Sequence, residues 1–286
     1  MPTNADELAE ILDLEPLDLN LFRGKQPDTA LQRVFGGQVA AQALVAAART
    51  TTDDRAIHSL HAYFLRPGDP RVPIIYDVDP LRDGRSFSSR RVLARQHGHP
   101  IFALTANFQV HETGFEHQDK MPAAPPPEDC PDVGALARAT AGERADQWSK
   151  DWAALELRRA GDSTSGDLPD TDEHPAKAQY WVRVIGRLPN SPVVHQAALT
   201  YLSDLTLIRT SLIPHRQGDF EASVQAASLD HAVWFHRPFR ADEWLLYVQR
   251  SPSASGARGL IFGELFTRDG ALAASVAQEA LIRPRG

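Results

Sequence analysis

Two stretches of the chain have the apolar spacing of a helix, and one of them is apolar around nearly its whole circumference. From Gly36 to Arg49 almost every residue is Ala, Val, Leu, Gly or Gln, which leaves no charged face. A helix of this kind must be buried on most of its sides. A second helix-like stretch runs from His195 to Leu212. Its apolar face, at i, i+3 and i+4 spacing, consists of Tyr201, Leu205, Ile208 and Leu212.

After each predicted helix the apolar residues change to the alternating spacing of β-strands. The strings "RVLARQHGHPIFALTANFQV" and "LIFGELFTRDGALAASVAQEALI" each contain two such runs around a turn pair. The turn pairs are His97-Gly98 and Asp269-Gly270, which are typical of tight turns between paired strands. An antiparallel sheet is therefore predicted to enclose each helix.

One phrase occurs twice in the chain. The string "SLHAYFLRPGDP" begins at Ser59, and the similar string "SLDHAVWFHRPF" begins at Ser228. When Arg66-Pro67 is aligned with Arg237-Pro238, the preceding helices and the following strands also correspond. A repeat of this length indicates two duplicated domains and not a solenoid of short units.

The composition changes between the two copies. The strings "MPAAPPPEDCPDVG" and "AGDSTSGDLPDTDEHPAKA" are rich in Pro, Gly, Ser and acidic residues, which is typical of an exposed linker. A short helix is predicted within it, between Ala135 and Arg159. The expected organisation is a first repeat over residues 1–113, a linker over residues 114–176 and a second repeat over residues 177–286.

Composition and charge narrow the possible functions. The chain has 286 residues, of which 42% are hydrophobic, enough to bury a large core. Thirty basic and 37 acidic residues give a formal net charge of −7, so nucleic acid is not an expected partner. No apolar run reaches the roughly twenty residues needed to cross a bilayer, and the first residues are acidic where a secretory signal is basic. We expect a cytoplasmic protein without membrane insertion.

A series of longer, specific strings spans both predicted repeats. They are "LFRG" at Leu21–Gly24, "VFGGQV" at Val34–Val39, "HSLHAYFLRPGDP" at His58–Pro70, "PIIYDV" at Pro73–Val78, "LRDGRSFSSRRV" at Leu81–Val92, "GFEHQ" at Gly114–Gln118, "SDL" at Ser203–Leu205, "LDHAVWFHRPF" at Leu229–Phe239, "EWLLY" at Glu243–Tyr247, "SPSASGARG" at Ser251–Gly259 and "VAQE" at Val276–Glu279. With these strings the sequence resembles the acyl-CoA thioesterase II family, the TesB-type enzymes.

The resemblance implies a fold and an activity. The fold is α+β, a double hotdog of two tandem repeats, each with a central helix wrapped by a curved antiparallel sheet. The activity is hydrolysis of fatty acyl-CoA to free fatty acid and CoA by an aspartate-activated water. No cofactor or metal is expected, the partner is the acyl-CoA substrate, and a homo-oligomer, dimer or tetramer, is expected.

Three polar residues stand out among apolar neighbours. Asp204 falls on the apolar face of the second predicted helix, where an isolated carboxylate would be costly, so it is either paired or at a cleft. Gln278 lies in the apolar last strand and needs hydrogen-bond partners, and Ser228 begins a strand. Taken singly, each is also explained by ordinary pairing or solvation.

The resemblance makes these three residues a set. It implies that Asp204, Ser228 and Gln278 hold the hydrolytic water, with Asp204 as its general base. Family members often carry Thr where this chain has Ser228. The oxyanion donors are expected at a helix start, in the helix of the second repeat. His58 either supports the site or is an ordinary core histidine.

Other catalytic signatures are missing from the sequence. It contains no G-x-S-x-G elbow, no H-E-x-x-H motif and no Walker loop. Two alternatives to the thioesterase stay open: a hotdog enoyl-CoA hydratase or dehydratase, and a non-catalytic acyl-CoA-binding protein. The helix-borne pairing of Asp with His that is usual in such hydratases is absent around Asp204, which counts against the first.

Overall fold

The computed structural model describes residues 1–141, 147, 149–163, 176–215 and 223–285. Its helices are α1 (Ala5–Leu12), α2 (Gly36–Ala48), α3 (Val133–Ala141), α5 (Pro192–Ser203) and α6 (Leu207–Leu212), with short 3₁₀ turns η1 (Pro127–Asp129) and η3 (Ile213–His215). Its strands are β1 (Glu15–Asp18), β2 (Leu21–Gly24), β3 (Arg55–Phe64), β4 (Ile74–Asp83), β5 (Phe87–Gln96), β6 (His99–Val110), β7 (Leu155–Asp162), β8 (Lys177–Val184), β9 (Val224–Ser228), β10 (Asp230–Phe235), β11 (Leu245–Ser255), β12 (Arg258–Thr267) and β13 (Leu272–Pro284).

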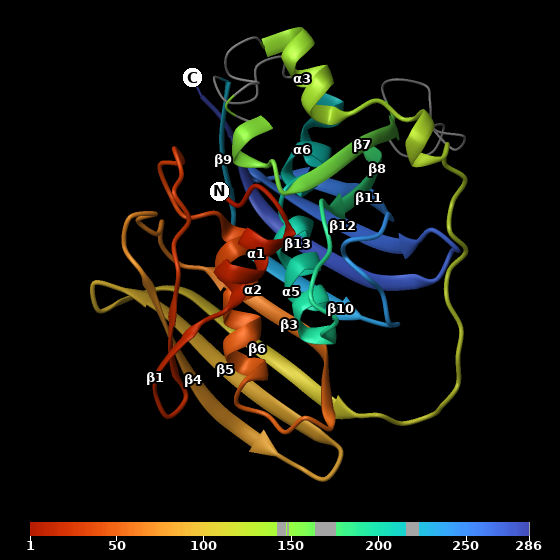
Figure 1. The fold of residues 1–286 in the computed structure, drawn as a ribbon. Coiled ribbons are helices and arrows are strands. Elements are labelled where there is room, and N and C mark those ends of the chain that lie inside the picture. Colours follow the sequence, from red (N-terminus) through yellow and green to blue (C-terminus); the bar gives the residue numbers. More distant parts are fainter. Residues whose placement is uncertain (142–146, 148, 164–175, 216–222, 286) are drawn as a thin grey trace.

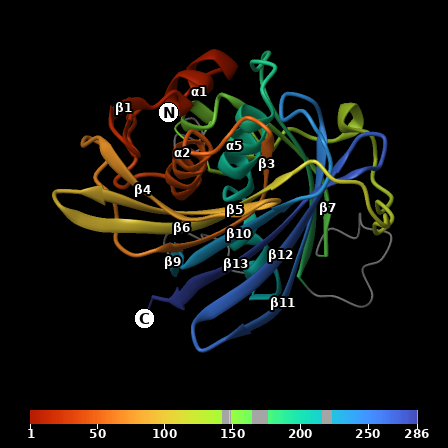
Figure 2. The same ribbon diagram turned by 90° about the horizontal axis from the view of Figure 1, so that it is seen from below.

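Within the described residues, thirteen strands form one sheet, in which the pairs are antiparallel. The order is β1-β2-β4-β5-β6-β3-β10-β13-β12-β11-β8-β7, and β9 pairs with β13. Strands β1 to β6 occupy one half of the sheet and strands β7 to β13 the other half. The sheet curves around the helices (Figure 2). This arrangement confirms the predicted α+β fold with central helices wrapped by antiparallel strands.

The two copies of the repeated phrase lie side by side in the middle of this sheet. They form β3 and β10, which pair antiparallel with Tyr63 opposite Asp230 and Ser59 opposite Trp234. In the sequence alignment of the repeats Tyr63 corresponds to Trp234, so the pairing is symmetric. Its centre is the pair His61 and Ala232. Each copy of the repeated phrase therefore supplies one of the two central strands. We call the β3–β10 pair, where the two halves of the sheet meet, the seam.

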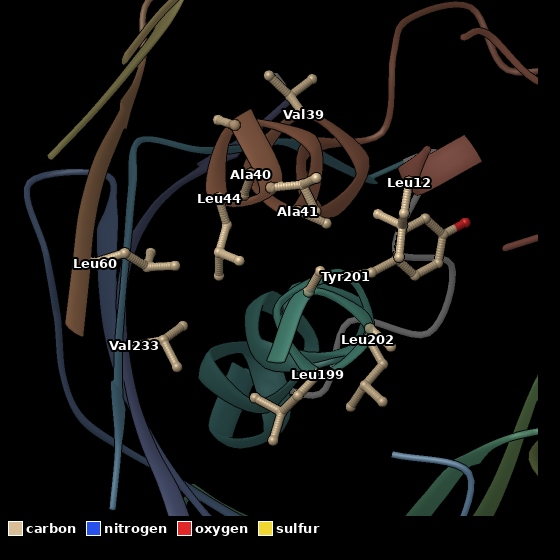
Figure 3. Packing of buried hydrophobic residues seen from close by; sticks show 14 of the residues in the cluster. Leu12, Val39, Ala40, Ala41, Leu44, Leu60, Leu199, Tyr201, Leu202 and Val233 are labelled. Carbon is tan, nitrogen blue, oxygen red and sulfur yellow. The ribbon is translucent and has the colours of Figure 1, made fainter. Parts of the chain in front are cut away.

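Helices α2 and α5 pack against each other on the concave face of the sheet (Figure 1). In α2 the residues from Gly37 to Ala47 are all buried, as its all-round apolar composition predicts. Gly37 lets the backbones approach closely, because a Cβ there would overlap the carbonyl oxygen of Tyr201. Figure 3 shows Leu60 of β3 and Val233 of β10 pointing from the sheet toward the helix pair. The core thus spans both repeats.

The second predicted helix is broken in the structure. The sequence predicted one helix from His195 to Leu212, but α5 ends at Ser203, with Asp204 as its C-cap residue, and α6 begins at Leu207. Gln249 of β11 fixes the break, since its side chain bonds the hydroxyls of Thr206 and Thr210 at 2.5 and 2.6 Å. Asp204 therefore lies at a helix end and not within a continuous helix.

The opposite end of the helix pair is built differently. There α2 ends at Arg49, whose guanidinium donates to the carbonyl oxygen of Leu14 and to Oδ1 of Asp13, both at 2.5 Å. Helix α5 begins at this end with Pro192, which has no N–H to donate. This end of the pair is fastened to the N-terminal segment that contains α1.

Part of the predicted linker belongs to the sheet. Leu155–Asp162 forms β7, which pairs with β8 and extends the sheet of the second repeat. Leu155 and Leu157 alternate inward there, but the charged residues Glu156 and Arg158 beside them make the segment read as polar in composition. Residues 164–175 lie outside the described residues. The stretch before α3 is held by Trp181, whose indole N–H donates to the carbonyl oxygen of Pro125 at 2.8 Å. Among the described helices none is long and apolar enough to cross a membrane.

Candidate active site

The structure brings three of the predicted site residues into hydrogen-bond contact. The hydroxyl of Ser228 donates to Oδ1 of Asp204 at 3.1 Å. The amide nitrogen of Gln278 donates to the hydroxyl oxygen of Ser228 at 3.0 Å. These residues are far apart in the sequence, so only the fold assembles them.

Each of the three is positioned by a different element. Asp204 is the residue at which α5 ends, and it is 7% exposed. Ser228 is the last residue of β9, opposite Ala280 of β13 in the sheet register. Gln278 lies on the inward face of β13 and is fully buried. The carboxylate therefore stands at the edge of the core, while its two partners come from the sheet.

The start of α2 reaches this carboxylate from the first repeat. A Cβ on Gly36 would lie 2.7 Å from Oδ2 of Asp204 and 2.7 Å from the ring of Phe64, so a larger residue would displace one of these side chains. Phe35 is the N-cap residue of α2, and within the described structure its side chain makes no capping hydrogen bond to the helix. The first N–H groups of a helix lack partners within the helix. Here they belong to α2, whereas the sequence placed the oxyanion donors in the helix of the second repeat.

The antiparallel packing of the two helices explains this difference. It sets the start of α2 beside the end of α5, so Asp204 of the second repeat meets a helix start of the first. The helix start of the second repeat lies at the far end of the pair, where Pro192 removes one donor.

Two further residues join the set, and sequence reasoning missed both. His231 of β10 lies between Gln278 and Ser203: Nδ1 is 2.6 Å from Oε1 of Gln278, and Nε2 is 2.9 Å from the hydroxyl of Ser203. Because Ser203 precedes Asp204 in the chain, the five residues Ser203, His231, Gln278, Ser228 and Asp204 close a ring. A signal was present: His231, Val233 and Phe235 share the inward face of one strand, so a polar side chain there needs a partner.

Tyr247 of β11 supports the end of α5. Its hydroxyl donates to the carbonyl oxygen of Ser203 at 3.0 Å. Burial, with a smaller contribution from the charge of Asp204, raises the pKa of Tyr247 well above its usual range. The phenol therefore stays protonated and serves as a fixed donor to one of the last carbonyl groups of the helix.

Known proteins resemble this chain over nearly its whole length. The acyl-CoA thioesterase family matches residues 169–281, and the acyl-CoA thioesterase N-terminal domain matches residues 25–109. Acyl-CoA thioesterase 2 of Haemophilus influenzae is 41% identical over 97% of both chains. The chain belongs to the acyl-CoA thioesterase family. Human acyl-coenzyme A thioesterase 8 is also 41% identical, over 96% of this chain and 88% of its own length.

Solved structures of the family agree with the architecture. The acyl-CoA thioesterase II TesB2 of Mycobacterium marinum is 45% identical and superposes with a TM-score of 0.83, covering 98% of this chain and 99% of its own. A hot dog protein of unknown function from Alicyclobacillus acidocaldarius is 22% identical with a TM-score of 0.76, over 98% of both chains, and shows the fold alone. The double hotdog predicted from the sequence is confirmed.

His58 lies outside the hydrogen-bonded ring of this thioesterase family member. It sits at an irregularity in the pairing of β3, with its ring 5.9 Å from the ring of Phe87. Six residues further along β3, about 20 Å at the rise of an extended strand, Phe64 is the residue that packs beside Gly36. Burial lowers the pKa of His58, and its Nε2 has no hydrogen-bond partner among the described residues. His58 is half-buried, and its placement away from the ring argues against a supporting role.

The described part of the chain groups no three His, Cys, Asp or Glu side chains in a way that could hold a metal ion. The chemistry available at the ring is that of a carboxylate with two neutral hydrogen-bonding partners beside a helix start. Such a set suits the deprotonation of a small molecule held next to an electrophile.

Proposed function

We propose that this chain hydrolyses acyl-CoA thioesters to a free carboxylic acid and CoA. The observation that carries the proposal is the Asp204–Ser228–Gln278 hydrogen-bonded set at the start of α2. It occurs in a chain that is 41% identical to proteins named acyl-CoA thioesterases. The roles of the individual residues are part of the same proposal.

In this mechanism Asp204 is the general base. Oδ1 of Asp204 already accepts the hydroxyl proton of Ser228. The other carboxylate oxygen, Oδ2, faces Gly36 and receives a proton from water. Gln278 donates one amide hydrogen to Ser228, and its second amide hydrogen orients that water. Asp204 takes this proton while the water oxygen attacks the thioester carbon. The new C–O bond therefore forms without free hydroxide.

The remaining steps follow from charge development. The carbonyl oxygen becomes an oxyanion, which the N–H groups at the start of α2 stabilise. The C–S bond then breaks and CoA leaves as a thiolate, whose conjugate thiol has a pKa of about 8.5. Because such a thiolate leaves readily, no strong general acid is required. The proton on Asp204 passes to the thiolate or to solvent, which restores the base.

A thiol-release assay on the purified chain tests the proposal. With acyl-CoA substrates from short to long, we expect free CoA thiol and free acid to appear in equal amounts. A non-catalytic acyl-CoA-binding protein would retain substrate without raising thiol release above background. A hydratase would convert enoyl-CoA to hydroxyacyl-CoA and release no thiol. Either result would replace the thioesterase proposal by that alternative.

Ser228 offers a test within the site. The variant Ser228→Thr keeps the hydroxyl and should retain most of the activity. The variant Ser228→Ala removes both hydrogen bonds of the hydroxyl, and kcat should fall by about ten- to a thousandfold. Steady-state kinetics on one good acyl-CoA substrate compare the two variants. Parental turnover in the alanine variant would remove Ser228 from the mechanism.

We also propose that residues 1–113 and 177–286 are the two repeats, with β7 added to the second. The support is that two separate segments, residues 25–109 and residues 169–281, match different parts of the same family. The seam between β3 and β10 lies where these repeats meet.

We further propose a cytoplasmic homo-oligomer. Apolar side chains stay exposed near the seam and on the first repeat, including Tyr63 at 64%, Leu65 at 47% and Leu81 at 52%. Contact with a second copy would cover such surface. Light scattering should give a mass of at least twice 31.5 kDa, and a mass of one chain would rule out self-association. Cell fractionation should recover the protein with cytoplasmic markers.

A further inference from the structure

The ring of hydrogen bonds contains one residue that the proposed mechanism does not use. His231 is fully buried, as are Ser203 and Gln278. Its Nδ1 lies 2.6 Å from Oε1 of Gln278, the shortest of the side-chain contacts in the ring. Because the imidazole of His231 is fully buried, solvent cannot replace a lost hydrogen-bond partner. Each of its side-chain contacts must therefore join a donor to an acceptor.

From Asp204 through Ser228 and Gln278 to His231, the donors and acceptors have one consistent order. The amide nitrogen of Gln278 faces the hydroxyl of Ser228, so its carbonyl oxygen faces His231 and can only accept. His231 must therefore carry a proton on Nδ1. The hydroxyl of Ser203 has a single proton, which it donates to the carbonyl oxygen of Thr200 at 3.1 Å or to Nε2 of His231 at 2.9 Å; the order at Gln278 does not depend on which acceptor takes it.

The opposite order has a specific consequence for the carboxylate. If Nδ1 of His231 were unprotonated, the amide of Gln278 would turn its nitrogen toward the histidine. Its carbonyl oxygen would then face Ser228 and compete with Asp204 for the single hydroxyl proton of that serine. Asp204 would lose the bond that occupies Oδ1, and Gln278 would lose the hydrogen that it offers to water.

We infer that His231 is a positioning residue for the reaction, an inference that rests on the proposed function. The proton on its Nδ1 holds the amide of Gln278 in one orientation, and that orientation directs the hydroxyl of Ser228 at Asp204. His231 touches neither water nor substrate and acts through Gln278. The backbone of His231 lies on β10 opposite Ala62 of β3, so the seam between the repeats sets its place.

Two substitutions at this position separate positioning from packing. In His231→Asn the amide nitrogen takes the place of Nδ1 and can still donate to Gln278, whereas His231→Leu fills similar space without a donor. We expect His231→Leu to lower kcat by about ten- to a hundredfold, the usual effect of losing an outer hydrogen-bond partner of a functional group. KM should change little, and His231→Asn should recover most of the lost turnover. A leucine variant with parental kcat would overturn the inference.

A double-variant comparison tests the route of action. If His231 acts through Gln278, adding His231→Leu to Gln278→Ala should lower kcat by less than about twofold further, because the two changes remove one shared function. Multiplying losses would show that His231 acts independently and would overturn the inference. The matched control is His236→Leu, because His236 also bonds a serine, Ser275 at 2.9 Å, but outside the ring. Its kcat should stay close to that of the parent.

A direct measurement needs no variant and no activity. Nitrogen NMR of the ¹⁵N-histidine-labelled chain distinguishes a protonated from an unprotonated Nδ1, with the signal assigned by its loss in His231→Asn. A proton on Nδ1 supports the inference, whatever the state of Nε2, and an unprotonated Nδ1 overturns it. If the chain released no CoA thiol at all, the proposed function would fail while this measurement still decided the order of the hydrogen bonds.

Discussion

Replacing Asp204 by asparagine should lower kcat by about a hundred- to ten-thousandfold, the contribution typical of a general base. The change is nearly isosteric. The asparagine carbonyl oxygen can still accept the hydroxyl proton of Ser228, so the ring stays connected, but the amide cannot take a proton from water. Substrate affinity and melting temperature should therefore change little while turnover collapses.

The control for this experiment is Asp230→Asn. Asp230 lies two residues after Ser228 and accepts the backbone N–H of Glu279 at 2.6 Å, outside the ring. Its loss should leave kcat close to that of the parent. A ring that served only stability would give the reverse pattern for Asp204→Asn, earlier melting with normal turnover. Hydrolysis at close to the parental rate would refute the proposed base even though the fold is right.

Separating the two repeats should abolish folding of the isolated parts. A fragment from Met1 to Thr113 would uncover the face of α2 that packs on α5 and the edge of β3 that pairs with β10. A large apolar face beside an unpaired strand edge favours aggregation. We expect this fragment to be insoluble or aggregated by size-exclusion chromatography, without a cooperative unfolding transition.

A cleaved but complete protein provides the control. A protease site introduced between Thr113 and Gly114, in an exposed stretch, allows the folded chain to be cut after purification. The two parts should then stay associated, because the seam and the helix pair hold them without the peptide link. A monomeric Met1–Thr113 fragment that unfolds cooperatively would count against mutual dependence of the repeats.

Sequence patterns predicted those elements that are buried along their whole length. The all-round apolar composition from Gly36 to Arg49 predicted a buried helix, and α2 has nearly those bounds. The break at Asp204 was missed because Tyr201, Leu205 and Ile208 continue the apolar spacing across it. Such spacing reports which side chains are buried and not whether the backbone helix is continuous. The side chain that holds the break, Gln249, comes from a distant strand.

The site was predictable only in part, for a similar reason. The resemblance to the family named Asp204, Ser228 and Gln278, and the structure places these three in contact. His231 was missed because its partner Gln278 lies 47 residues away, a pairing that no local pattern contains. The sequence analysis expected the oxyanion donors in the helix of the second repeat, whereas the helix start that lies beside Asp204 is that of α2. The antiparallel packing of α2 and α5 cannot be seen in either helix alone.

The unlike ends of the helix pair have a consequence for stoichiometry. The symmetric seam gives both ends equivalent places in the fold, yet one end carries Asp204 and the other carries Arg49 at the corresponding helix terminus. A guanidinium offers N–H donors and no acceptor, so it cannot take a proton from water, and Pro192 cannot donate an N–H at that end. On the proposed mechanism one chain therefore holds one reaction centre, although the proposed division gives it two repeats. On the same proposal the second end takes no part in catalysis, and Arg49 there instead holds the N-terminal segment through Asp13 and Leu14.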